Sequence, residues 1–273
     1  MKLLAGLSLA AISLQSGAAF GAETGLKQDA GAEQSGLDEI IVTARRANEN
    51  LQDVPVAITA MTGIELSERR VVTGADINLV TPSVTFKSTA SPQGSSNIQI
   101  RGIGTAGVNR SFEGSVGVFV DGVYRSRAGQ VLANFLDVES LQVLRGPQGT
   151  LFGKNTSAGA LLVTSRKPEV GDRDGTYELS IGSLGLRSLR AAASAAAGPG
   201  DFRLAGLYSE TDGGIYSPAA DRRLNNHKTW ALKGQVAFET TGGTSIRFIA
   251  DYSQDKGDCC YASVDAINGP TTP

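Results

Sequence analysis

The chain has 273 residues, of which 41% are hydrophobic and 19% are charged, and its formal net charge is -2. This balance excludes a disordered chain, and 25 basic against 27 acidic residues without a basic stripe argue against nucleic-acid binding. One histidine and two adjacent cysteines exclude most metal-site spacings and most nucleophile–histidine pairs, so an enzyme is disfavoured. The 34 glycines exceed the ordinary share of about 7% and favour tight turns and kinked strands.

The first 22 residues have the order of a secretory signal peptide. Lys2 supplies a positive charge, residues 3–14 are apolar, and small residues offer a cleavage site, which we place within 19–22. An apolar stretch of about 12 residues is too short to span a bilayer, which needs about 20. We therefore expect export. No other stretch is long and apolar enough for a transmembrane helix, so a membrane protein of this sequence has to be a barrel.

Residues 23–37 are small and polar and predict a flexible segment. They lead to a short β-prone run for which the sequence offers nothing to pack against: Asp38, Glu39, Ile40, Ile41, Val42, Thr43 and Ala44. An unpaired run on a flexible tether can add to the edge of a partner's sheet through main-chain hydrogen bonds.

Residues 49–168 alternate short strands, short helices and glycine turns, which predicts a compact α+β domain. Thr62 and Glu65 fit a capping box at the start of a helix. A second short helix is expected to stop before Pro82, because the residue before proline avoids helical geometry. Its range is 75–80; strands are expected at 56–60, 97–101, 116–120, 141–145 and 160–164, and a helical turn near 131–135.

From residue 170 onward, longer runs alternate apolar residues with polar or small ones, which predicts strands with one apolar and one wet face. The alternating runs are 177–181, 202–208, 230–238 and 246–252. A soluble sandwich would show the same alternation. Short turns at 198–201 and 241–243, with a longer polar loop at 212–227, favour an outer-membrane barrel. His227 is expected to be a residue of that loop and not a ligand.

Two glycine-rich stretches resemble nucleotide-binding loops, but the residues in and around them do not fit nucleotide binding. Residues 102–107 match G-x-G-x-x-G, but residues 108–114 lack the apolar stripe of the helix that a pyrophosphate needs. Residues 149–155 have one spacer too few for a phosphate loop and carry Asn155 where Ser or Thr must hold magnesium.

Cys259 and Cys260 are adjacent in an exported chain. They could form a strained vicinal disulfide, act as a pair of thiol ligands, or each pair with a cysteine outside this sequence.

Three stretches resemble the TonB-dependent outer-membrane receptors. Residues 38–44 resemble the TonB box, the strand that such receptors lend to their inner-membrane energiser. Residues 98–102 (IQIRG) and 117–124 (GVFVDGVY) resemble two plug strands, and 137–156 (DVESLQVLRGPQGTLFGKNT) resembles the most recognisable plug motif. The chain departs from the family after Thr156, where Ala158 stands in place of a glycine, so the geometry of that turn is in question.

The resemblance implies a signal peptide (1–22), a flexible N-terminus with the TonB box (23–48), an α+β plug domain with a small mixed sheet (49–168) and antiparallel strands of a barrel (170–273). It implies plug-motif and plug–barrel contact roles for Arg101, Gly102, Asp121, Gly122, Arg145, Gly146, Pro147 and Gly149. The two arginines would pair with glutamates of the barrel wall, or else be exposed strand ends. A barrel of this kind has about 22 strands. We expect only about five from this sequence, hence an incomplete barrel.

The function that the resemblance implies is active uptake across the outer membrane without catalysis, cofactor or bound metal. The ligand would be a ferric siderophore or another iron complex, or else a saccharide, haem or cobalamin. The partners would be the TonB energy-transducing complex of the inner membrane, outer-membrane lipid and the small-molecule ligand. A passive plugged porin is an alternative. A signalling receptor is another, but residues 23–37 are too few for the extra domain that such members carry.

Overall fold

The computed structural model describes residues 41–42, 49–50, 54, 56–88, 96–104, 113–126, 129, 132, 134–168, 173–197, 200–218, 221–240 and 242–257. The chain divides into residues 1–38 and 39–273, and all described residues belong to the second unit. The expected signal peptide, most of the run 38–44, the adjacent cysteines and residues 105–112 lie outside the described residues.

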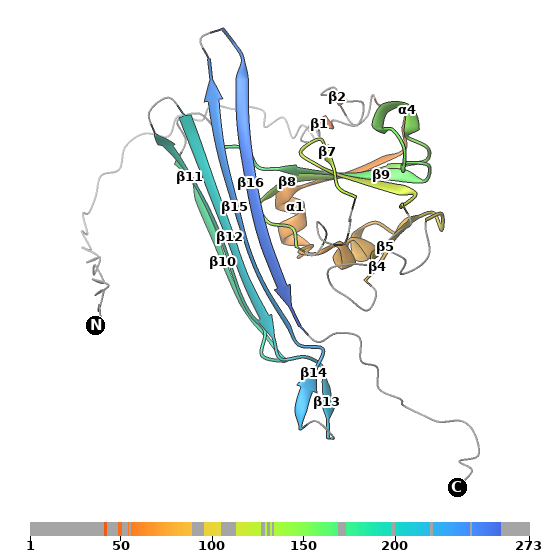
Figure 1. Ribbon diagram of the computed structural model, residues 1–273, viewed down its shortest axis with the longest axis vertical. Coiled ribbons are helices and arrows are strands. Elements are labelled where there is room, and N and C mark those ends of the chain that lie inside the picture. The colour runs from red at the N-terminus through yellow and green to blue at the C-terminus, as the bar shows by residue number, and fades with distance from the viewer. Residues whose placement is uncertain are drawn as a thin grey trace, which may run out of the picture. The chain divides into compact units, whose positions relative to one another are not determined.

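A five-stranded mixed sheet organises the part of the chain expected to be the plug, residues 49–168 (Figure 1). In spatial order its strands are β3 (Ile58–Thr62), β8 (Val138–Arg145), β9 (Gly159–Ser165), β6 (Val116–Val120) and β7 (Val123–Tyr124). The β6–β9 pair is parallel and the other pairs are antiparallel. A separate antiparallel ladder joins β4 (Val84–Ser88) to β5 (Ser96–Ile100).

The described helices of this domain are short: α1 (Gly63–Glu68), the 3-10 turn η1 (Gly74–Asp76), α2 (Ile77–Val80) and α4 (Gly149–Phe152). The capping box predicted for α1 is confirmed, with the Glu65 amide donating to Thr62 Oγ1 at 3.3 Å and the Thr62 amide to Glu65 Oε2 at 2.8 Å. The helix predicted to stop before Pro82 ends at Val80. Within the described part of the chain, no helix is long and apolar enough to cross a membrane.

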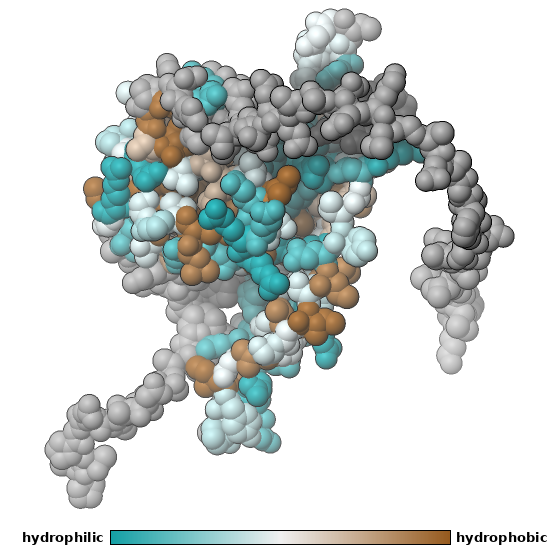
Figure 2. Space-filling view, turned by 180° about the vertical axis from the view of Figure 1, so that it is seen from behind, coloured by the Kyte–Doolittle hydropathy of each residue, from teal (hydrophilic) through white to brown (hydrophobic). Residues whose placement is uncertain are grey.

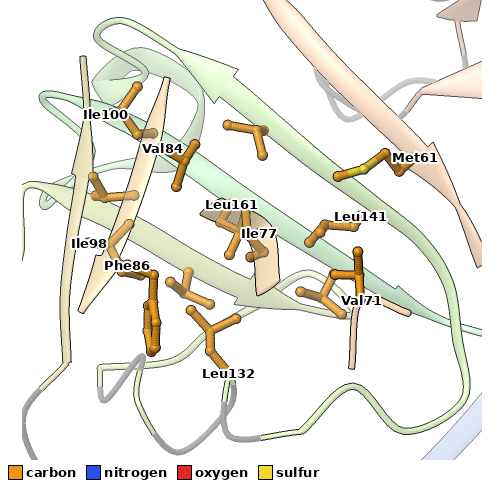
Figure 3. Packing of buried hydrophobic residues seen from close by; sticks show 14 of the residues in the cluster. Met61, Val71, Ile77, Val84, Phe86, Ile98, Ile100, Leu132, Leu141 and Leu161 are labelled. Carbon is orange, nitrogen blue, oxygen red and sulfur yellow. The ribbon is translucent and has the colours of Figure 1, made fainter. Parts of the chain in front are cut away.

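The plug has a hydrophobic core between its sheet and the helical segments (Figure 3). Ile77 of α2, Ile100 of β5, and Leu141 and Leu161 of the sheet are each at most 2% exposed. Burying an aliphatic side chain of this size contributes about 1.5–3 kcal/mol. The core therefore fixes the strands whose ends carry the plug motifs.

Five long antiparallel strands follow the plug (Figure 1). Their order is β10 (Gly175–Ile181), β11 (Arg187–Ala197), β12 (Gly200–Thr211), β15 (His227–Glu239) and β16 (Ser245–Lys256). A small hairpin of β13 (Ile215–Ser217) and β14 (Arg222–Leu224) lies in the connection between β12 and β15. The segment predicted as a polar loop at 212–227 thus contains two short strands, and His227 begins β15 instead of ending a loop.

The two faces of this sheet differ in chemistry. One face exposes large apolar side chains: Tyr177, Leu179, Ile181, Leu189, Phe202, Leu204, Tyr208, Trp230, Leu232, Ile246, Phe248 and Tyr252. Hydrophobic residues, brown in Figure 2, reach the surface beside hydrophilic ones. A sandwich would bury that face under a second sheet, whereas a barrel turns it toward lipid. The fold is therefore an α+β domain, the expected plug, followed by antiparallel strands of an incomplete barrel.

Other predicted limits of strands and turns differ from those in the structure. The strand expected at 56–60 occupies Ile58–Thr62, so Val56 and Ala57 precede it. Asp201, placed in a turn, belongs to β12. The helical turn expected near 131–135 lies partly outside the described residues.

Some further elements were not predicted, among them β4, β11 and α4. Strand β11 was missed because its second half is nearly all alanine, which gives no apolar alternation. Strand β4 and helix α4 were missed as well, since a run of five residues or a single turn gives little periodicity.

Candidate functional site

Asp121 and Gly122 form the tight turn between β6 and β7. Both have positive φ, 50° and 80°, as a two-residue turn of type I′ requires, and Asp-Gly is a favoured pair there. One oxygen of the Asp121 carboxylate accepts from the Ser165 amide at 3.0 Å and the other from its hydroxyl at 2.8 Å. Arg247 of β16 donates to the same carboxylate at 3.1 Å. Asp121 thus connects the turn, the end of β9 and a barrel strand.

Arg145 lies at the end of β8 and contacts the plug. Its Nη2 donates to Thr59 Oγ1 at 2.5 Å, and its backbone amide donates to the carbonyl of Ala57 at 3.0 Å. The Nε atom of Arg145 is buried without a hydrogen-bond partner. The guanidinium is therefore held by one hydroxyl and is only partly satisfied.

The motif continues from Arg145 as a turn and a short helix. Gly146 has φ of 92° and donates its amide to the carbonyl of Ala158 at 3.1 Å. Pro147 follows it on the exposed surface, and Gly149 begins α4. Ala158 is buried, has no positive φ and donates to the carbonyl of Ser115 at 2.9 Å, so the departure from glycine is accommodated.

Arg101 and Gly102 form an exposed turn after β5, with φ of 53° and 77°. The Arg101 amide donates to the carbonyl of Ser83 at 2.7 Å. Within the described residues neither Arg101 nor Arg145 forms a salt bridge. The glutamate partners expected for both arginines remain a prediction.

The most buried ion pair of the described residues was not predicted from the sequence. Nε and Nη2 of Arg203, in β12, each donate to the Asp137 carboxylate at 2.7 Å. The side chains of Arg203 and Asp137 are 2% and 5% exposed. Nη1 of Arg203 also donates to Asp174 at 3.0 Å and to Ser194 Oγ at 2.7 Å. One guanidinium thus joins the start of β8, the segment before β10, and β11.

Asp174, which precedes β10, is held in its charged form by this network. A hydrogen bond from Ser194 is the largest cause that lowers its pKa, and the neighbouring Arg203 and Arg166 act in the same direction. Partial burial of the carboxyl opposes them.

Backbone carbonyls of the plug also receive hydrogen bonds from the inward face of the barrel strands. Lys233 donates to the carbonyl of Leu136 at 2.7 Å and to Ser165 Oγ at 2.9 Å, and Gln235 to the carbonyl of Arg166 at 2.7 Å. The apolar contribution is small: the side chain of Leu136 packs against Ala205, Leu207 and Ala231. The contact between plug and strands is therefore mainly polar.

The sequence contains a signal for this contact between plug and barrel strands. Arg203 and Lys233 are charged residues in the middle of alternating strands, on the face opposite to the large apolar residues. A charge at such a position has to point into the barrel, where it needs a partner. Which plug residue supplies the partner depends on tertiary placement, and the sequence pattern does not contain it.

The run 38–44 was expected to have no neighbouring strand, and this was wrong for its two described residues. Ile41 and Val42 form β1 and pair antiparallel with Asn50 and Glu49 of β2. The ladder has only two residues in each strand. A two-stranded ladder of this length has few hydrogen bonds and is only marginally stable.

Comparisons with known proteins agree with this arrangement. A family profile described as the TonB-dependent Receptor Plug Domain matches residues 50–160. The pesticin receptor of Yersinia pestis is 29% identical over 143 residues, which is 51% of this chain and 21% of that receptor. The vitamin B12 transporter BtuB of Vibrio vulnificus is 27% identical over 181 residues, 64% of this chain and 28% of that transporter.

Among solved structures, the ferric yersiniabactin uptake receptor FyuA from Yersinia pestis superposes with a TM-score of 0.67 at 22% identity. The match covers 74% of this chain and 32% of that receptor. The chain therefore spans about a fifth to a third of the length of the proteins it resembles.

Proposed function

Because this chain belongs to the TonB-dependent receptors, outer-membrane proteins in which a plug domain fills a β-barrel, we propose that it serves active uptake of a ferric siderophore or another iron complex. The plug would close the barrel in the resting state. The TonB complex of the inner membrane would supply the energy through residues 38–44, and ligand binding at the outer side would precede each transport step.

The observation that carries this proposal is the polar character of the contact between plug and barrel strands. Asp121, Asp137 and the carbonyl of Leu136 meet Arg247, Arg203 and Lys233 across it. Polar interfaces between domains of one chain generally permit relative motion, whereas large hydrophobic ones do not. A plug held by ion pairs and hydrogen bonds can shift and return, as a gated receptor requires and a passive plugged porin does not.

Iron complexes are the favoured ligand class because FyuA is named for ferric yersiniabactin uptake. Cobalamin is the second candidate, since the Vibrio vulnificus relative is a vitamin B12 transporter. Saccharide and haem remain further members of the same transport class. The ligand contacts are expected in outer loops.

Energy coupling is tested by Ile41→Pro, with Ile41→Ala as the matched control. Proline has no amide donor and fixes φ, so it removes ladder bonds that a partner strand would use, while alanine keeps the backbone. The receptor is produced in cells, and binding and energy-dependent accumulation are measured with iron-loaded siderophores and with cyanocobalamin. We expect the proline variant to bind an iron complex normally but to lose accumulation, and the alanine variant to retain both.

Other results discriminate between explanations. Normal accumulation by the proline variant would remove residues 38–44 from the coupling role. Loss of binding together with accumulation would indicate a structural role, in which Ile41 acts through its pairing with Asn50. If cells accumulate cyanocobalamin and no iron complex, the ligand is cobalamin and not an iron complex.

A further inference from the structure

A row of charged residues crosses the apolar face of the barrel strands near one end. Arg187, Glu210, Lys228 and Lys256 lie opposite one another on the neighbouring strands β11, β12, β15 and β16. Residues that are opposite in register share a face, and so do residues two apart along a strand. The row is therefore on the same face as the exposed apolar residues, at the end where β12 and β15 are joined by the hairpin β13–β14.

Aromatic residues lie directly next to this row, on the side toward the middle of the sheet. Tyr208 and Trp230 are opposite one another, and the rings of Trp230 and Tyr252 are 4.9 Å apart. The Lys228 ammonium lies 5.3 Å from the centre of the Tyr208 ring. Tyrosine and tryptophan gather at the depth where lipid chains meet headgroups. The charged row is one step further out, at the depth of the headgroups themselves.

The row has an excess of positive charge. Its single carboxylate, Glu210, is already occupied, since it accepts from the Tyr208 hydroxyl at 2.5 Å and lies 3.6 Å from Lys228. Arg187 and Lys256 are exposed and have no salt bridge within the described part of the chain. An open hollow of about 530 Å³ at the same rim adds the cation Arg223.

Two carboxylates line that hollow, Glu210 and Asp212, against the three cations Arg223, Lys228 and Lys256. Arg187, on the other side of Glu210, adds a fourth positive charge. The opposite end of the same apolar face has no such row among the described residues. There Phe238 lies between Gly200 and Ile246.

We propose that this row binds the phosphate of a phosphorylated lipid headgroup, whose acyl chains lie along the adjoining apolar face. Phosphate oxygens would be shared by Lys228 and Lys256, with Arg187 and Arg223 at the flanks. The occupant is a lipid and not free phosphate because the cations continue directly into an exposed aromatic and aliphatic surface. This site does not depend on which ligand the receptor transports.

The test uses the receptor purified in detergent micelles and probed with lipid A, a phosphorylated lipid, by native mass spectrometry. Each basic residue near a headgroup changes affinity about fivefold, so Lys228→Gln with Lys256→Gln should weaken lipid A binding roughly thirtyfold. Lys228→Arg with Lys256→Arg keeps both charges and should keep binding within about threefold. Glu210→Gln removes the only carboxylate of the row and should not weaken binding.

Correct folding of each variant is checked by the heat-dependent shift of the folded barrel on a gel. Unchanged lipid A binding by the folded double glutamine variant would overturn the proposal. So would equal binding of inorganic phosphate and lipid A, because the apolar face would then contribute nothing. Equal losses in the glutamine and arginine variants would also overturn it, since the effect would not follow charge.

Discussion

The guanidinium of Arg203 faces the carboxylate of Asp137 through two hydrogen bonds of 2.7 Å, and the two residues lie on a barrel strand and on the plug. This pair fixes the point where β8 begins relative to β12. Because both side chains are nearly inaccessible to water, loss of one partner leaves an uncompensated charge in a poorly solvated place.

Arg203→Gln should therefore destabilise the assembled receptor by about 3–5 kcal/mol. The readout is thermal unfolding in detergent, together with proteolysis of the segment between the plug and β10. Arg203→Lys keeps the charge but not the two-pronged geometry, so it should lie between the wild type and the glutamine variant. Combining Arg203→Gln with Asp137→Asn should recover part of the loss. An additive double variant would show that the two residues do not interact.

Low pH should weaken the contact between Asp174 and Arg203. The pKa of Asp174 is lowered in the folded protein, first by the hydrogen bond from Ser194 and then by nearby arginines. A lowered folded-state pKa gives stability that is complete above the unfolded value of about 3.9 and is lost as pH falls through the folded value. Melting temperature should thus fall below about pH 4, and the fall should be smaller in Ser194→Ala. Parallel pH profiles of the two proteins would contradict this assignment.

Asp121→Ala should loosen the plug at a second place. It removes the acceptor for Ser165 and the partner of Arg247, and a hydrogen bond to a charged group is worth about 1.5–3 kcal/mol. Faster hydrogen exchange at the end of β9 is the expected signal. Arg247→Gln removes the contact with β16 only, so it should leave exchange in β9 close to wild type. If both variants exchange alike, the turn and the strand contact act as one unit.

The isolated plug, residues 49–168, is expected to fold and stay soluble, because it has its own core. Thr62→Ala removes the α1 cap and should cost about 1 kcal/mol in its denaturant unfolding. Residues 170–273 alone should aggregate, since their apolar face and strand edges are open. A soluble, monomeric 170–273 fragment would support a soluble sandwich fold instead of a barrel.

The hairpin connection 212–227 is expected on the outer side of the membrane and the turn 198–201 on the periplasmic side. Protease added to intact cells should therefore cut the first and spare the second. Cleavage confined to the turn would reverse the orientation. The phosphate-binding row at the hairpin end would then face the inner leaflet.

Sequence patterns were sufficient for the architecture because periodicity and turn chemistry are local. Alternation placed Trp230 and Leu232 on the apolar face, and the Thr62–Glu65 capping box placed α1. The pairing of Arg203 with Asp137 was not accessible, because it depends on which plug loop meets which strand. The pairing of Ile41 with Asn50 was missed for the opposite reason: two residues are too short a run to show any period.

The network around Arg203 also bears on the order of folding. Asp137 and Asp174 both lie within hydrogen-bond reach of the same guanidinium, so two carboxylates are brought together wherever Arg203 is absent. Their mutual repulsion opposes docking until β12 has formed. We therefore expect plug docking to follow the formation of β12, because this strand carries Arg203. During synthesis and export the plug would travel undocked, and the bilayer-inserted strand would supply the charge that seats it.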